Sequence, residues 1–252
     1  GEYADAPALE KQARYNAADA MVQQHQYDEA VALFTALGDY NDSLARVRQA
    51  RYDKAVHTAE GGDPLAAAQL FLAMGDYRDA PAQAEAMYDR YYGSMVNPVN
   101  LAYNEGRYTD VVSLIDTLDM TQVPEKYAYL RGVYRESCYR QGNALYDAGK
   151  PYEALKWYRM IPGYKSVDSK LQKGCYLILG QWTDLKGDLY IFWDDGTCSL
   201  GGEEMTFSVD GDRMYTGESA DMQAETHRLT GVTRQHAWLY DKRSGTEITI
   251  YL

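Results

Sequence analysis

Apolar and polar residues follow a helical period over the first two-thirds of this 252-residue chain. In segment 27–37 the apolar residues keep the i, i+3, i+4, i+7 spacing of one helix face: Ala30, Leu33, Phe34 and Leu37. Such a face must be buried against another element. Because the same pattern returns further along the chain, we predict pairs of packed helices through residues 1–176.

The helical pattern repeats with a fixed period. Segments 15–51 and 52–88 align without gaps as two units of 37 residues. Their matching positions are Tyr15/Tyr52, Ala18/Ala55, Ala30/Ala67, Leu33/Leu70, Phe34/Phe71, Gly38/Gly75, Asp39/Asp76, Tyr40/Tyr77 and Asp42/Asp79. Further units are predicted at 89–138 and 139–175, and a partial unit at 1–14, where Tyr3 and Asp5 keep the register. The first helix of unit 89–138 is expected to be longer and interrupted by Pro98.

The motif Gly-Asp-Tyr-x-Asp marks the corner between consecutive units. It comprises Gly38, Asp39, Tyr40 and Asp42, and again Gly75, Asp76, Tyr77 and Asp79. A residue without Cβ ends a helix at little cost in the left-handed conformation, and Asp42 and Asp79 are expected to cap the next helix. A phosphate-binding or calcium-binding loop would need more glycines or more ligands. We therefore predict a structural corner.

The order Ala18, Tyr27, Ala30, Phe34 and Leu37 resembles the small, aromatic and apolar positions of tetratricopeptide repeats, over roughly residues 3–176. The usual period of those repeats is about 34 residues, and they commonly end with proline where this chain has its Gly-Asp-Tyr-x-Asp corner. The resemblance implies a solenoid with a concave groove that binds a protein or peptide. Similar arrays occur in bacterial surface or membrane-anchored proteins, so it also implies an extracytoplasmic location and an anchor upstream of residue 1.

Near residue 177 the pattern changes to strict alternation punctuated by turns, so we predict a second domain over 177–252. Asp-Gly and Ser-Gly pairs mark tight hairpins between the expected strands. Those strands are 181–184, 189–193, 197–200, 205–209, 213–217, 224–232, 237–240 and 246–252. Antiparallel strands in sequence order close most simply into a small barrel or form a meander. The predicted fold class is α+β in two domains, a helical solenoid followed by an antiparallel β domain.

The stretch from Gly180 to Phe192 resembles the Gly-x-Trp start of lipocalin-like domains. That resemblance implies a barrel that binds a small ligand. Two interpretations of the strand aromatics stay open: they fill the core of a narrow barrel, or some of them line a shallow apolar or carbohydrate-type cleft. The candidates for such a cleft are Trp182, Tyr190, Trp193 and Trp238.

The charge and composition of the chain exclude some classes of binding partner. The chain has 37 acidic and 25 basic residues and a formal net charge of −12, which disfavours nucleic acid and anionic membrane surfaces. No apolar run is long enough to span a bilayer, so we expect no direct membrane insertion. Cys138, Cys175 and Cys198 have no metal-binding or redox spacing, and free thiols packed as small hydrophobic groups are expected.

Familiar catalytic signatures are missing from the sequence. His25, His57, His227 and His236 are scattered and none stands in a zinc motif, so neither a metal site nor a cofactor is expected. The paired carboxylates Asp194/Asp195 and Glu203/Glu204 fall at predicted turns, where acidic residues are solvated. We predict a non-catalytic protein-binding or peptide-binding scaffold; the alternative is a ligand-binding barrel displayed on a helical spacer.

Overall fold

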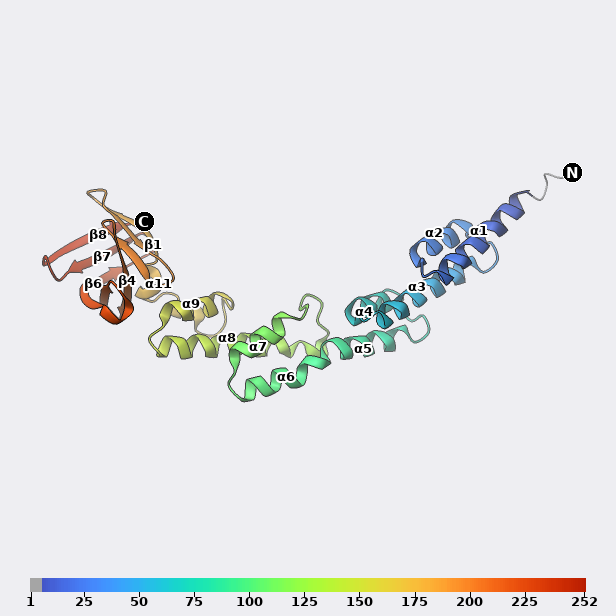
Figure 1. Cartoon of the computed structure of the whole chain (residues 1–252), viewed down its shortest axis with the longest axis horizontal. Helices are drawn as coiled ribbons and strands as arrows, with labels where there is room; N and C mark the ends of the chain where they lie inside the picture. Colours follow the sequence, from blue (N-terminus) through green and yellow to red (C-terminus); the bar gives the residue numbers. More distant parts are fainter. Residues whose placement is uncertain (1–5) are drawn as a thin grey trace. The chain divides into compact units, whose positions relative to one another are not determined.

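The structure, a computed structural model, describes residues 6–252 (Figure 1). A helical part is followed by a closed antiparallel barrel, which confirms the predicted fold class. Tyr3 and Asp5, on which the partial unit 1–14 rests, lie outside the described residues. The α-helices are α1 (Ala6–Gln23), α2 (Tyr27–Leu37), α3 (Ser43–Glu60), α4 (Pro64–Leu72), α5 (Ala80–Tyr91), α6 (Gly93–Asn104), α7 (Tyr108–Asp116), α8 (Tyr129–Asp147), α9 (Pro151–Arg159), α10 (Val167–Lys170) and α11 (Gly174–Leu177).

The chain divides into two compact units. The first runs to Asn100 and includes Leu118–Tyr127; the second combines Leu101–Thr117 with Ala128–Leu252. The second unit therefore contains the last helices as well as the barrel. Short 3₁₀ helices occur once in each unit, η1 (Glu125–Tyr127) in the first and η2 (Ala220–Met222) in the second.

Each of the first two hairpins has its own small core. Ala18 of α1 packs with Ala30, Phe34 and Leu37 of α2, and all four are buried. The next hairpin repeats this arrangement with Ala55 of α3 and Ala67 and Phe71 of α4. The apolar face predicted for segment 27–37 is thus confirmed. Small residues in one helix let the aromatic residue of the other approach closely, and burial of these side chains favours the paired arrangement.

One expectation about the helices is wrong. Pro98 does not interrupt its helix but lies inside α6, and the break falls earlier, between Tyr91 and Gly93. Proline removes only the backbone bond to residue 94, which stands in the first turn of α6. Tyr127 packs against Gly93, where a Cβ would lie 3.1 Å from the tyrosine hydroxyl oxygen.

Eight strands form a closed barrel in sequence order, and each of the eight predicted strands is found. They are β1 (Gly180–Asp184), β2 (Leu189–Phe192), β3 (Thr197–Leu200), β4 (Glu203–Asp210), β5 (Arg213–Gly217), β6 (Ala224–Val232), β7 (His236–Asp241) and β8 (Thr246–Tyr251). The barrel closes through β1 and β8, where Thr183 pairs with Tyr251 and Asp184 with Ile250. Closure leaves no sheet edge free.

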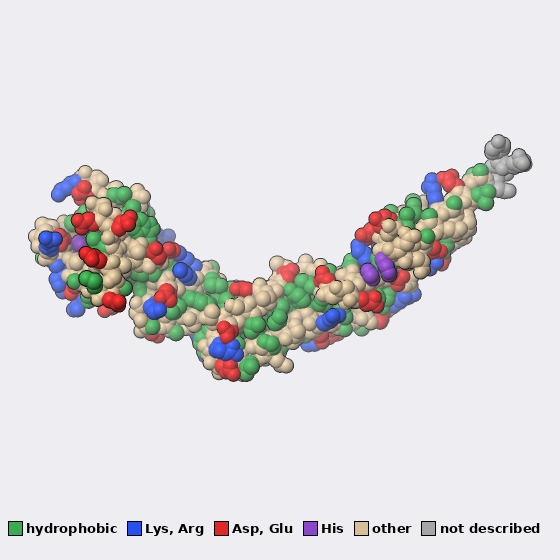
Figure 2. All heavy atoms as spheres, in the orientation of Figure 1, with side chains coloured by type: hydrophobic (Ala, Val, Ile, Leu, Met, Phe, Trp, Pro, Cys, Tyr) green, Lys and Arg blue, Asp and Glu red, His purple; other side chains and the backbone are tan. Residues whose placement is uncertain are grey.

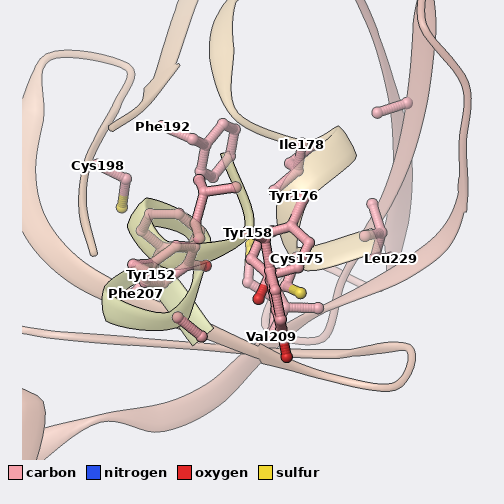
Figure 3. Close-up of a cluster of buried hydrophobic side chains, with 14 of the residues drawn as sticks. Tyr152, Tyr158, Cys175, Tyr176, Ile178, Phe192, Cys198, Phe207, Val209 and Leu229 are labelled. Carbon is pink, nitrogen blue, oxygen red and sulfur yellow. The ribbon is translucent and has the colours of Figure 1, made fainter. Parts of the chain in front are cut away.

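The barrel core continues into the preceding helices across residue 177. One buried cluster joins Tyr152 of α9 and Cys175 of α11 with Phe207 and Leu229 of the barrel (Figure 3). The ring centroids of Tyr152 and Phe207 are 5.0 Å apart. A Cβ at Gly174 would lie 3.0 Å from Leu229. Helices α9 and α11 therefore cover one end of the barrel, the end with the β2–β3 and β4–β5 turns.

Candidate functional site

Gly38 is the C-cap residue of α2, whereas α4 ends at Leu72 with Ala73 as its C-cap, so Gly75 lies in the turn after the helix end. Gly38 and Gly75 have φ values of +61° and +59°, in the left-handed region where only glycine avoids a steric penalty. Asp39 and Asp76 are exposed. Tyr40 lies edge-on against Tyr15, as Tyr77 does against Tyr52, with ring centroids 6.2 and 6.0 Å apart. The corner tyrosines thus pack between helices.

The expected capping by Asp42 and Asp79 is wrong. Both residues stand at the N-cap position of α3 and α5, but neither side chain bonds to the backbone amides of its helix. Asp79 instead accepts a hydrogen bond from the Tyr52 hydroxyl at 2.6 Å, and Asp42 accepts one from Tyr15. These hydrogen bonds join the first helix of each repeat, α1 or α3, to the corner that ends the same repeat.

An apolar pocket of about 260 Å³ lies in the first unit between α4, α5 and the segment before α8. Its lining residues are Leu72, Pro81, Ala84, Glu85, Tyr88, Asp89, Pro124, Lys126 and Tyr127. Leu72 is 54% exposed, although leucine gains free energy when buried. An exposed leucine beside an apolar hollow is the kind of surface that binds an apolar side chain of a partner.

Polar contacts hold the far wall of this pocket in place. Asp89 accepts hydrogen bonds from Lys126 at 2.8 Å and from Tyr127 at 2.7 Å. The Lys126 and Tyr127 hydrogen bonds lower the pKa of the Asp89 carboxyl, so the carboxylate stays ionised. Tyr92 donates to the Asp119 carbonyl at 2.6 Å, which fixes the same segment further upstream. The pocket is therefore preformed.

The four aromatic residues proposed for a cleft in the barrel do not lie together. Trp182 and Tyr190 are paired on the inner face, where the Trp182 indole donates to the Ile178 carbonyl at 2.7 Å. Trp193 follows the inward-facing Phe192 and is 38% exposed. Trp238 stands between the buried Ala237 and Leu239, so it faces outward. Strand alternation sends the four to opposite faces of the sheet.

A different pocket, of about 450 Å³, lies at the barrel end opposite α9 and α11. Its lining residues are Leu200, Glu203, Met205, Thr216, Glu225, Thr226, His227, Asp241, Lys242 and Arg243. Thr216 and Thr226 share a hydrogen bond of 2.8 Å between their hydroxyls. Leu200 and Met205 are the apolar residues of this lining, and the other eight are polar or charged.

His227 is the residue of this second pocket that sequence reasoning missed. Burial lowers the pKa of His227, while the nearby Asp241 carboxylate opposes that shift. Its Nδ1 lies 2.9 Å from the Thr226 hydroxyl. His227 pairs with the buried Met214 and lies two positions from the buried Leu229, so strand alternation turns it into the barrel. That alternation is the signal in the sequence that could have found it. The sequence does not show that Asp241 of β7 pairs with it at the barrel mouth.

Two further expectations concern the cysteines and the turn carboxylates. All three cysteines are buried free thiols, as predicted, and burial raises the pKa of Cys138 and Cys198 to about 12. Asp194 pairs with Arg159, and Asp195 accepts the Thr197 amide at 2.9 Å in the β2–β3 turn. Both interactions lie at the surface, so these carboxylates hold a turn together and remain solvated.

Within residues 6–252, no three or more His, Cys, Asp or Glu side chains are grouped to hold a metal ion. None of the helices described combines the length and apolarity needed to cross a bilayer. Comparison with protein-family models, with curated proteins and with solved structures gives no significant match. The pocket beside Leu72 and the pocket around His227 are therefore the candidate binding sites.

Proposed function

We propose that this chain is a non-catalytic protein-binding or peptide-binding scaffold whose helical hairpins are a 37-residue variant of the tetratricopeptide type. The observation that carries the proposal is the preformed apolar pocket beside the exposed Leu72. The helices around it are fixed by buried cores and by the tyrosine contacts of the corners. A rigid frame lowers the entropy lost on binding.

The pocket suits one apolar side chain of a partner rather than a large ligand. Its volume of about 260 Å³ is below the usual range for drug-sized molecules, which is roughly 300–1,000 Å³. Glu85 is exposed at the rim, and the chain has a net charge of −12. An apolar anchor next to a cationic residue complements both features. We therefore propose a peptide segment of that kind as the partner.

A selection of random peptides on the full chain tests this proposal. We expect enriched peptides to carry an apolar residue beside Lys or Arg, and to lose at least tenfold in affinity for Leu72→Glu. Leu44→Glu is the matched control, because Leu44 is 57% exposed on α3 and lies outside the pocket. Equal binding by the two variants would show that the pocket is not the peptide site.

The second candidate function is a small-ligand site in the barrel mouth, as in lipocalin-like proteins. The pocket of about 450 Å³ around His227 favours it. Sugar and lipid fragments should then protect the full chain against thermal unfolding, and His227→Gln should remove that protection. His236→Gln is the control, since His236 lies on the outer face beside Trp238. Protection that survives in His227→Gln would place the ligand elsewhere.

An extracytoplasmic location of a bacterial protein follows only from the resemblance of the repeats, and it stays a prediction. Fractionation of the native source with an antibody against this chain measures it. Recovery in the cytoplasmic fraction would contradict the location without affecting either binding proposal.

A further inference from the structure

Two histidines that are distant in the sequence lie face to face on the surface of the first of the two compact units. The rings of His25 and His57 are 4.3 Å apart between centroids, and their planes differ by 8°. Both residues are exposed, and histidine side chains gather on this face in Figure 2. His25 belongs to the turn between α1 and α2, and His57 to the last turn of α3. The pair therefore joins the first hairpin to the helix that follows it.

At the backbone position of His25, the other helical repeats have glycine. Its φ is +61°, and it stands two residues before the second helix of its hairpin. At the same place before α4, α7 and α9 the chain has Gly62, Gly106 and Gly149, with φ between +72° and +89°. A side chain in this conformation carries a steric cost that glycine avoids.

The surroundings orient the His25 ring and favour a cation. His25 Nδ1 lies 2.9 Å from the hydroxyl oxygen of the largely buried Tyr27, which leaves Nε2 as the nitrogen open to solvent. A hydrogen bond on one imidazole nitrogen is the usual way to aim the other at a metal ion. Burial raises the pKa of Tyr27, and the carboxylates of Asp53 and Glu60 raise it further.

We propose that His25 and His57 together bind one divalent transition-metal ion of the zinc, nickel or copper type, with water completing its coordination. Imidazole nitrogens suit these ions and bind zinc at about 2.0–2.1 Å, so two of them on one ion stand up to about 4.2 Å apart. The ring centroids are 4.3 Å apart, so the two side chains reach the same point on the surface. In the stacked arrangement their nitrogen lone pairs do not converge, so each ring turns about its side-chain bonds when the ion binds. Both side chains are exposed, which leaves room for that turn. The bound ion clamps the α1–α2 turn to α3.

Calorimetric titration of the full chain with zinc chloride, and separately with nickel chloride, tests the site. We expect one ion per chain for the wild type, and at least tenfold weaker binding for both His25→Gly and His57→Gln. His25→Gly is a strict test because glycine is the residue at the equivalent positions, so the variant keeps the fold. His236→Gln is the control for histidines elsewhere and should bind like the wild type.

Thermal unfolding gives an independent readout of the same site. Metal should raise the Tm of the wild type and of His236→Gln, and leave that of His25→Gly unchanged. Either of two results would overturn the proposal: no uptake by the wild type at millimolar metal, or uptake by His25→Gly or His57→Gln equal to that of the wild type. Circular dichroism of the metal-free variants confirms that each is folded.

Discussion

Tyr52 donates its hydroxyl hydrogen to the carboxylate of Asp79, 27 residues later, at 2.6 Å. Tyr15 and Asp42 make the same contact one unit earlier, and the Tyr139 hydroxyl lies 2.8 Å from that of Ser166 later in the chain. The tyrosine comes from the first helix of a unit and its partner from the corner that follows. This contact is therefore the recurring tie between a helix and the end of its unit.

The hydrogen bond between Tyr52 and Asp79 predicts that the two residues are energetically coupled. Tyr52→Phe removes only the hydroxyl, and Asp79→Asn removes the charge that strengthens the bond, so each should lower the Tm. In the double variant the two losses should not add, because Asp79→Asn only weakens a hydrogen bond that Tyr52→Phe already removes. Tyr129→Phe, at an exposed tyrosine, is expected to leave the Tm unchanged. Strict additivity of the two single changes would show that the contact contributes nothing.

Two glycines of α8 should respond to alanine in opposite directions. A Cβ at Gly142 would lie 2.6 Å from Cε1 of the buried Tyr158, so Gly142→Ala should destabilise the fold by about 1–3 kcal/mol. At Gly132 a Cβ would lie within 4 Å of no described atom beyond the neighbouring residues and backbone of its own helix. Gly132→Ala should stabilise by about 0.5–1 kcal/mol through helix propensity alone. Urea unfolding measures both, and losses of equal size would refute the packing at Gly142.

Two buried tyrosines of α9 differ in the state of their hydroxyls. The Tyr152 hydroxyl has no hydrogen-bond partner among residues 6–252, whereas that of Tyr158 donates to Asn143 at 2.9 Å. Removing an unsatisfied buried polar group relieves its desolvation cost, so Tyr152→Phe should stabilise the protein by about 1 kcal/mol. Tyr158→Phe should destabilise it by a similar amount. If Tyr152→Phe proves destabilising in chemical denaturation, its hydroxyl has a partner in solution.

The lowered pKa of the Glu136 carboxyl leads us to expect that the protein loses stability in acid. Burial opposes its ionisation, but hydrogen bonds from Lys165, Arg140 and Tyr164 outweigh burial and lower the pKa to about 2. A lowered pKa stabilises the fold above pH about 4.5, and that stabilisation is lost as the pH falls toward 2. With screening by solvent the effect is on the order of 2 kcal/mol. The stability of Glu136→Gln should fall less between pH 5 and 3 than that of the wild type; parallel curves would contradict this.

The shared core predicts that the barrel depends on the helices before it. A chain of residues 177–252 lacks Tyr152, Cys175 and Tyr176, which belong to the buried cluster. Each large side chain that loses such burial costs about 1.5–3 kcal/mol. The shorter chain should therefore unfold at a lower temperature than one that starts at residue 93 and keeps α6 to α11. Equal Tm values would mean that the barrel core is complete without α9 and α11.

Much of the architecture follows from local sequence patterns. The 37-residue period, the glycine corners and the eight strands were each predictable, because helix periodicity, strand alternation and turn chemistry act over a few neighbouring residues. Strand order followed as well, since short turns leave consecutive strands little choice but to pair. The wrong prediction about Pro98 shows the limit of local rules. The break falls at Tyr92, between α5 and α6, beside a close contact between Gly93 and Tyr127, residues 34 positions apart.

The sequence by itself determined the helical units, their corners and the strands of the barrel. Only the tertiary structure assigned Asp79 to Tyr52, brought His25 onto His57 and placed His227 in the mouth of the barrel. It also separated Trp182 from Trp238 onto opposite faces of the sheet. These relationships join residues many positions apart, and they exist only once helices and strands have packed. Local periodicity determines which face of a helix or strand is buried. It does not determine which side chains of two packed elements contact each other.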